Sequence, residues 1–203
     1  MADLDLARGS SKMKAIAGMD GDLLISQLHP RYYQSTLAGR ICAAYTATVA
    51  TSVPATATIG LTVWNPPSSG VRLAMMKWTS QIVVTSAACT GIALAGGYQS
   101  TTPTTVTAAT ATGRTFVNGT VLTAGKAQAY NIATVLVAPI ILCVLHHNTA
   151  AIAVTGEDTN AGDLEGAIVV DQGGFVCFTA LGAAAAASAH TMSIVWEEVP
   201  INP

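Results

Sequence analysis

From residue 41 onward, short apolar runs rich in β-branched residues alternate with turn-forming residues. Runs of this kind, bounded by Gly, Pro, Asn and Asp, predict β-strands. Residues 71–84 are the clearest case, because polar side chains such as Arg72 and Lys77 interrupt apolar neighbours and predict a strand with one wetter face. The other predicted strands are 46–51, 55–64, 91–96, 114–123, 131–144, 151–154, 167–170, 175–181 and 191–199.

Strong turn and loop signals separate these strands. Residues 65–70 read Asn-Pro-Pro-Ser-Ser-Gly and residues 171–174 read Asp-Gln-Gly-Gly, so both predict tight turns. The Thr-rich segment 98–112 predicts an exposed loop or an irregular edge, and the polar segment 155–166 predicts a surface loop. Five consecutive alanines at 183–187 fit a loop or a crowded contact between subunits, and also a short helix.

Many short strands without a long amphipathic helix are typical of a sandwich. Parallel α/β folds are excluded, because they need crossover helices. The expected fold is all-β: an antiparallel jelly-roll-like β-sandwich over residues 41–203, preceded by an extended N-terminal arm over residues 1–40.

The first 40 residues differ in composition, since they hold five of the nine basic residues and four of the eleven acidic residues. Two interpretations are open for this segment. It is either a solvated terminal segment or an arm that attaches the protein to a partner. In the second case the predicted anchors are Leu28, Arg31, Tyr32 and Tyr33, because Tyr and Arg are favoured at interfaces.

Charge is scarce along the whole chain. Hydrophobic residues make up 51% of the sequence and charged residues 10%, with a formal net charge of −2. So few charges favour burial of surface in a permanent oligomer, and they do not suggest binding to nucleic acid. The longest apolar run, residues 132–145, is about 14 residues long and contains Pro139, so it is too short and too interrupted to span a membrane as a helix. No signal peptide is apparent in the first residues, so synthesis in a cytoplasm is expected.

The acidic residues are confined to the two ends of the sequence. No Asp or Glu lies between Leu23 and Gly156. Most enzyme mechanisms and hard-metal sites need a carboxylate, so we predict no catalytic, cofactor-binding or metal-binding residues and no enzyme activity. His146 and His147 would point to opposite faces of a strand. An enzyme would need one of them to pair with an acid from 157–171.

Two further groups of side chains have modest alternatives. The acidic residues of 157–165 resemble a calcium loop only loosely, so a solvated loop is the default interpretation. The four cysteines, Cys42, Cys89, Cys143 and Cys177, are far apart in sequence and are expected to be buried reduced thiols, with disulfides as the alternative.

Three short segments resemble motifs of tailed-bacteriophage virion proteins. They are Trp64-Asn65-Pro66-Pro67-Ser68-Ser69-Gly70-Val71, followed by a strand with Lys77; Gly173-Gly174-Phe175 with the alanine run and Ser193-Ile194-Val195-Trp196-Glu197-Glu198; and Leu28-His29-Pro30-Arg31-Tyr32-Tyr33.

The resemblance implies a trimeric jelly-roll module on a virion. It would be bound to the major capsid protein or another virion protein as a cement or decoration protein. The alternative is a tail or head fibre or spike with a receptor- or glycan-binding surface, in which Tyr98, Gln99 and the Thr-rich loop would form the tip.

Overall fold

The computed structural model describes residues 4–8, 11–17, 23–24, 32–46, 49–50, 60–84, 91–105, 114–115, 125–146, 159–182 and 189–201. The chain divides into two compact units, Met1–Gln34 and Ser35–Pro203. Residues 35–40 therefore belong to the larger unit, although the sequence placed them in the arm.

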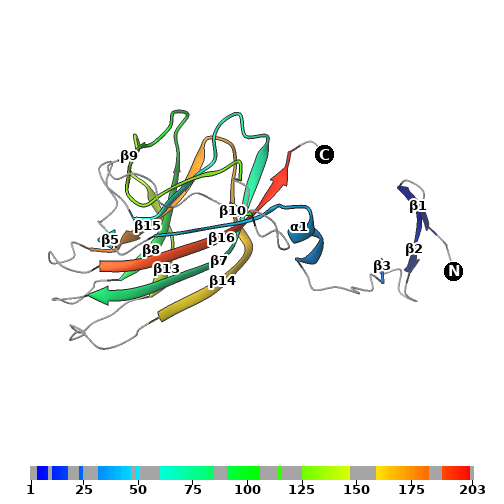
Figure 1. Cartoon of the computed structure of the whole chain (residues 1–203), viewed down its shortest axis with the longest axis horizontal. Helices are drawn as coiled ribbons and strands as arrows, with labels where there is room; N and C mark the ends of the chain where they lie inside the picture. The colour runs from blue at the N-terminus through cyan, green and yellow to red at the C-terminus, as the bar shows by residue number, and fades with distance from the viewer. Residues whose placement is uncertain are drawn as a thin grey trace. The chain divides into compact units, whose positions relative to one another are not determined.

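The N-terminal unit contains a small antiparallel sheet. Strand β1 (Leu4–Arg8) pairs with β2 (Ser11–Ala17), and β2 pairs with β3 (Leu23–Leu24) (Figure 1). Helix α1 (Tyr33–Leu37) contains the boundary between the two units, and Gly39, in the larger unit, closes it with a positive φ of 66°. Among the described residues, no helix is long and apolar enough to cross a membrane.

The larger unit is built from two main antiparallel sheets (Figure 1). One sheet has the order β10-β4-β16-β7-β14, with β5 also paired to β16. The other has the order β11-β6-β15-β8-β13, and β12 pairs with β9 in a small ribbon. The strands are β4 (Ile41–Tyr45), β5 (Val49–Ala50), β6 (Thr62–Trp64), β7 (Val71–Val84), β8 (Ile92–Tyr98), β9 (Thr104–Thr105), β10 (Arg114–Thr115), β11 (Gln128–Tyr130), β12 (Ala133–Thr134), β13 (Ile140–His146), β14 (Thr159–Val170), β15 (Gly174–Ala180) and β16 (Ala189–Pro200).

Eight of the described strands pair in a nested order. In sequence order the first pairs with the last and the second with the last but one, giving β4 with β16, β6 with β15, β7 with β14 and β8 with β13. The pairs fall alternately into the two sheets, which is the arrangement of a jelly roll. The predicted antiparallel jelly-roll-like sandwich is confirmed.

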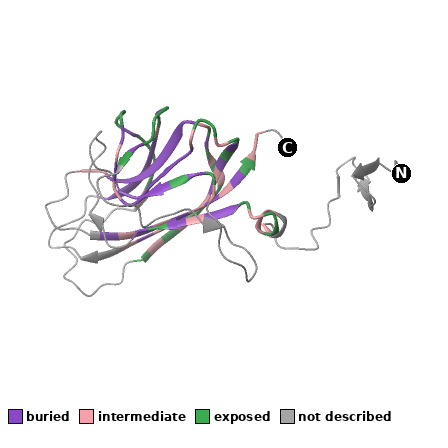
Figure 2. Cartoon of the chain, turned by 45° about the horizontal axis from the view of Figure 1, so that its top comes forward, coloured by how far each residue is buried: buried purple, intermediate pink, exposed green. Residues whose placement is uncertain are grey.

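The core lies between the two sheets (Figure 2). Its largest fully buried side chains include Trp196, Phe178, Leu73 and Met75. Along β7, Leu73 and Met75 are buried, whereas Arg72 and Lys77 are exposed. The predicted strand with one wetter face is therefore present.

The prediction for residues 155–166 is wrong over its described part, 159–166. These residues belong to β14, an edge strand that pairs with β7 from Thr159 onward. Exposed and half-buried positions alternate along it, because an edge strand of a sandwich keeps one side in water. The register shifts between Asp163 and Ile168, where Glu165 and Gly166 have positive φ angles of 49° and 81°. The segment resembles a loop in composition because this strand has polar side chains and contains glycines, one of them in its bulge.

Other predicted segments lie partly or wholly outside the described residues. Their undescribed parts are residues 47–48, 51–59, 106–113, 116–124 and 147–158, and the alanine run at 183–187. Within the Thr-rich segment, β9 pairs with β12, and Tyr98 ends β8.

A smaller apolar cluster covers the opposite face of the second sheet. Successive residues of a strand point to opposite faces, so Val176 and Phe178 enter the main core while Phe175 and Cys177 join Trp64 and Tyr130 on the other side. Phe175 lies opposite Gly97 of β8. A Cβ atom on Gly97 would be 2.8 Å from the end of the Phe175 ring. The aromatic ring therefore occupies the space that the glycine leaves open.

We expect Gly97→Ala to lower the free energy of unfolding by about 1–3 kcal/mol, because the added methyl group overpacks against a buried ring. Urea unfolding followed by tryptophan fluorescence measures the change. In a Phe175→Leu background the same substitution should cost less, because the ring is absent. Equal costs in both backgrounds would show that the ring does not restrict this position.

Candidate functional site: an apolar strand edge and groove

The predicted arm residues are only partly described by the structure. Tyr32 is half-buried and immediately precedes α1, and Tyr33 is the first residue of that helix. Leu28 and Arg31 lie outside the described residues. The role of these four residues in attachment stays a prediction.

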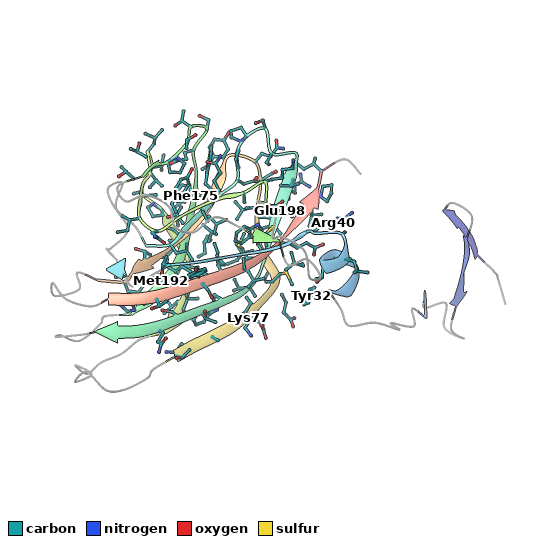
Figure 3. The ribbon with its side chains drawn as sticks, in the orientation of Figure 1. Tyr32, Arg40, Lys77, Phe175, Met192 and Glu198 are labelled. Carbon is teal, nitrogen blue, oxygen red and sulfur yellow. The ribbon has the colours of Figure 1, made fainter. Side chains whose placement is uncertain are left out.

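The segment that leads into β4 is tied to the last strand. Ser35 Oγ donates a hydrogen bond of 2.6 Å to Glu197 Oε1, and the Glu198 backbone N–H donates to the Arg40 carbonyl at 2.8 Å. Figure 3 labels Arg40 and Glu198 where these segments meet. The beginning of the larger unit is thus held to β16 by both side-chain and backbone hydrogen bonds.

Glu198 is a buried carboxylate, with only 7% of its surface exposed. Its Oε1 accepts a hydrogen bond of 2.9 Å from the Ala127 backbone N–H. The thiol of Cys42 also lies beside it, and burial, together with the charge of Glu198 and a hydrogen bond to it, raises the pKa of that thiol. The carboxylate therefore fixes the segment before β11 to β16, which is a structural role.

Two edge strands with opposite character flank one side of the sandwich. Among the described strands, β14 pairs only with β7, and β13 pairs only with β8. The exposed positions of β14 include Asp163 and Glu165, and charges and bulges commonly protect an edge from association. By contrast, β13 has the sequence Ile-Ile-Leu-Cys-Val-Leu-His, without an acid or a lysine.

The side chains of β13 are unusually exposed for a strand of this composition. Ile140 exposes 74% and Val144 exposes 57% of its surface, and Ile141 and Leu142 are also exposed. Among the described side chains of this strand, those of Cys143 and Leu145 pack against the main core. Leu136 and Val137, just before the strand, are exposed as well. This edge and its preceding corner form a continuous apolar stretch in the sequence, which we call the β13 edge (residues 136–144).

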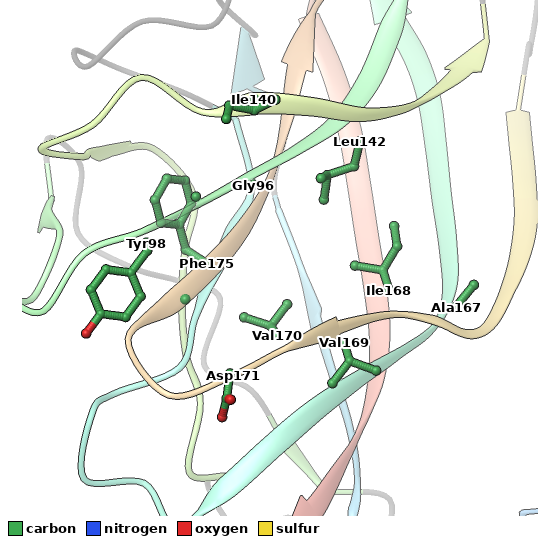
Figure 4. Close-up of a pocket in the computed structure, with 12 residues that line it drawn as sticks. Gly96, Tyr98, Ile140, Leu142, Ala167, Ile168, Val169, Val170, Asp171 and Phe175 are labelled. Atoms are coloured by element: carbon green, nitrogen blue, oxygen red, sulfur yellow. The ribbon is translucent and has the colours of Figure 1, made fainter.

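An apolar groove of about 540 Å³ lies beside the β13 edge (Figure 4). Aliphatic and glycine residues make up most of its walls, and Tyr98 and Asp171 are the lining residues that carry a polar side-chain group. The lining residues are Gly96, Gly97, Tyr98, Ile140, Leu142, Ala167, Ile168, Val169, Val170, Asp171, Gly174 and Phe175. The bulged part of β14 supplies one wall, and β8 with β13 supplies the other.

Asn65 holds the turn at the end of the groove. Its backbone N–H donates to the Gly174 carbonyl at 2.9 Å, and its carbonyl accepts from Gly173 N–H at 2.7 Å. Its side-chain Nδ2 donates to the carbonyls of Val71 and Val170 at 2.8 and 3.3 Å. The two turns predicted at 65–70 and 171–174 are therefore joined through one buried amide.

Asp171 is the charged group at the rim of the groove. The backbone N–H of Gln172 donates to its Oδ1 at 2.9 Å, and Arg72 Nε lies 3.4 Å from the same oxygen. The Gln172 hydrogen bond first, and Arg72 second, lower the pKa of Asp171. The carboxylate is exposed to solvent and already has local partners.

The histidines and the acids of the second half of the chain are dispersed among the described strands. His146 ends β13, whereas His190 is buried on β16 in the other sheet; His147 lies outside the described residues. Asp163 and Glu165 lie on β14, and Glu157 and Asp158 are not described. Within the described part of the chain, no group of three metal-ligating side chains is present.

Gln99 has a role that its sequence context did not indicate. The residue is buried, its Nε2 donates to the Thr101 carbonyl at 2.8 Å, and its Oε1 accepts from Leu136 N–H at 3.0 Å. It therefore positions the corner before β13. The neighbouring Tyr98 remains 64% exposed at the groove.

Three cysteines are free thiols, as predicted: Cys42 and Cys177 are buried and Cys143 is half-buried. Cys89 lies outside the described residues. Burial raises the pKa of Cys177, and it also raises that of Cys143 although a backbone hydrogen bond from Leu94 opposes the shift.

Comparison of this chain with family models, curated proteins and solved structures found no match.

We expect the free energy of unfolding to fall as the pH rises above about 8.5, the ordinary pKa of a thiol. Above that pH the unfolded chain loses thiol protons that the folded chain keeps, because burial raises the pKa of Cys42 and Cys177. Each thiol contributes a slope of up to about 1.4 kcal/mol per pH unit. Urea unfolding between pH 7 and 10 measures it, and the Cys42→Ala/Cys177→Ala variant should show a smaller slope. An identical slope in that variant would contradict the assignment.

Proposed function

We propose that this chain is a non-enzymatic structural protein of a tailed-bacteriophage virion. In this proposal it forms a homotrimer that attaches to the capsid as a cement or decoration protein. The observation that supports it most directly is the β13 edge, which exposes aliphatic side chains in a chain with only 10% charged residues. The motif resemblance supports the virion, the capsid partner and the three-fold assembly.

Such a protein acts by binding, so the free energy of its attachment would come from the surface that binding buries. Burial of apolar area is worth roughly 25 cal/mol per Å². Contacts between copies would bury the β13 edge, while the segment 1–40 would bind the shell. Three segments that bind together raise the overall affinity far above that of one segment.

A fibre or spike protein with a glycan-binding surface is the second candidate. The observation in its favour is Tyr98, an exposed aromatic ring beside a groove, since amphipathic rings suit such surfaces. The buried Gln99, with both amide atoms bonded to the backbone, is not available to a glycan. This favours the cement or decoration role.

The first test is the mass of the purified chain in solution, full length and as residues 35–203. We expect a trimer in both forms, because residues 35–203 form a compact unit that contains the β13 edge. Light scattering after size exclusion gives the mass. Monomers at about 100 µM in both forms would contradict self-association, since this concentration lies far above the Kd of a stable interface.

The second test concerns attachment to the shell. We expect Arg31→Ala/Tyr32→Ala to weaken co-sedimentation with capsids of the same virus at least tenfold, because interface Tyr and Arg residues often cost about 2 kcal/mol when removed. Lys12→Ala/Lys14→Ala, which also removes charge from the N-terminal unit, is the matched control. Equal loss of binding in both variants would point to a general effect of charge. No loss in either variant would show that Arg31 and Tyr32 do not anchor the protein to the capsid.

A further inference from the structure

The exposed apolar surface of the larger unit is concentrated in one region. Eight of the eleven exposed large hydrophobic side chains among the described residues belong to the β13 edge or the adjoining groove wall. They are Tyr98, Leu136, Val137, Ile140, Ile141, Leu142, Val144 and Val169. Surface apolar residues are usually scattered singly, so this concentration is the strongest candidate for an interaction surface among the described residues.

The size of this region matches one side of a stable interface. Full burial of an aliphatic side chain corresponds to about 60–120 Å² at the usual transfer coefficient, so eight roughly half-exposed side chains supply on the order of 400 Å² of apolar area. A standard interface buries about 800 Å² per partner, and somewhat more than half of it is apolar. The exposed side chains therefore provide most of the apolar area that one partner needs.

The same region contains both projecting side chains and a groove. Leu136 and Ile140 project with 68% and 74% of their surfaces exposed. Beside them the groove between β8, β13 and β14 is large enough for a small molecule or several side chains. Leu136 and Val137 lie outside the groove lining, whereas Ile140 lies at its rim and belongs to the lining. A neighbour in a closed ring could therefore insert Leu136 and Val137 while its own groove accepts those of the next copy.

Strand addition along β13 fits less well than side-chain packing. The pairing of β13 with β8 shifts register between Ile141 and Cys143 and again between Val144 and His146. Such bulges twist an edge and interrupt its ladder. The aliphatic side chains, by contrast, are accessible without any change in the strand.

We propose that the occupant of this groove is a second copy of the chain, which inserts aliphatic side chains of its β13 edge against Val169 and Tyr98. A second copy is favoured because it supplies an aliphatic, uncharged surface of matching size. This inference rests on the proposed self-association and names the surface responsible for it.

The test compares full-length variants at the β13 edge with one outside it. Ile140→Asp and Leu142→Asp place a charge in the contact, whereas Tyr45→Asp places one on β4 in the other sheet, at a position about as exposed as Ile140. We expect the two edge variants to dissociate at least 100-fold more readily in sedimentation equilibrium, and Tyr45→Asp to assemble like the wild type. Thermal unfolding verifies the fold, and if either Asp variant fails to fold, Ile140→Ser replaces it.

A cross-link identifies the occupant directly. Chains with p-benzoylphenylalanine at position 140 are mixed with ¹⁵N-labelled wild-type chains and irradiated. Cross-links from position 140 to labelled residues 167–171 or Tyr98 support the proposal.

The remaining outcomes overturn it in distinguishable ways. Assembly that is equally strong in all variants, with cross-links elsewhere, would refute the groove contact and leave the proposed function standing. A wild-type chain that is monomeric would refute both, and the groove would then belong to a small apolar molecule or to a different protein.

Discussion

The pairing of β16 with β7 is the interaction on which the rest of the sandwich depends. The two strands are in register from Ala189 to Pro200, with two irregularities, and lie at the centre of their sheet. Because β16 is the last strand, this pairing brings the end of the chain against its first half. Trp196 and Ile194 then enter the core, Glu198 holds Ala127, and Glu197 holds Ser35. The main core, the segment before β11 and the entry to β4 all depend on where β16 is placed.

The two sheets end in edges of different character. Strand β14 lies beside β7 at one edge of the first sheet, and β13 lies beside β8 at one edge of the other. A jelly roll does not close into a complete barrel, so its edges must be protected in other ways. Charged side chains and a bulge protect β14. Strand β13 is also bulged, but it has no acid or lysine, and its aliphatic side chains remain exposed.

Local sequence patterns predicted much of this architecture. The alternation around Arg72 and Lys77, and the turn residues at 65–70 and 171–174, follow from short-range rules, and they correctly placed β7 and the turns around it. The jelly-roll class followed from the number of short strands and the lack of a long helical pattern. Each of these features depends on residues that are close in sequence.

Features set by long-range pairing were harder to predict. The segment around Asp163 resembles a loop in composition, and only its pairing with β7 makes it a strand. The sequence did not single out Glu198 among the acids near the end of the chain. Residues i and i+2 of a strand share a face, so a buried Trp196 would have predicted that Glu198 is buried as well. Gln99 appeared to be a tip residue, whereas its amide bonds to Leu136, which is distant in sequence. The groove combines β8, β13 and β14, so no single segment could indicate it.

The antiparallel pairing of β4 with β16 sets Ile41 opposite Glu197, so the first strand of the sandwich starts beside the point where the last one finishes. A short peptide linker could therefore join these two points, and new termini could be opened at an exposed turn such as 66–70. In such a circularly permuted chain the strand neighbours stay the same while their order of synthesis changes. Because the Ile201 N–H donates to the Gly70 carbonyl at 3.0 Å, that turn lies beside the end of β16. Permutation there would keep a fused peptide at the same end of the sandwich and attach it to β7 instead of β16, without altering the packed core.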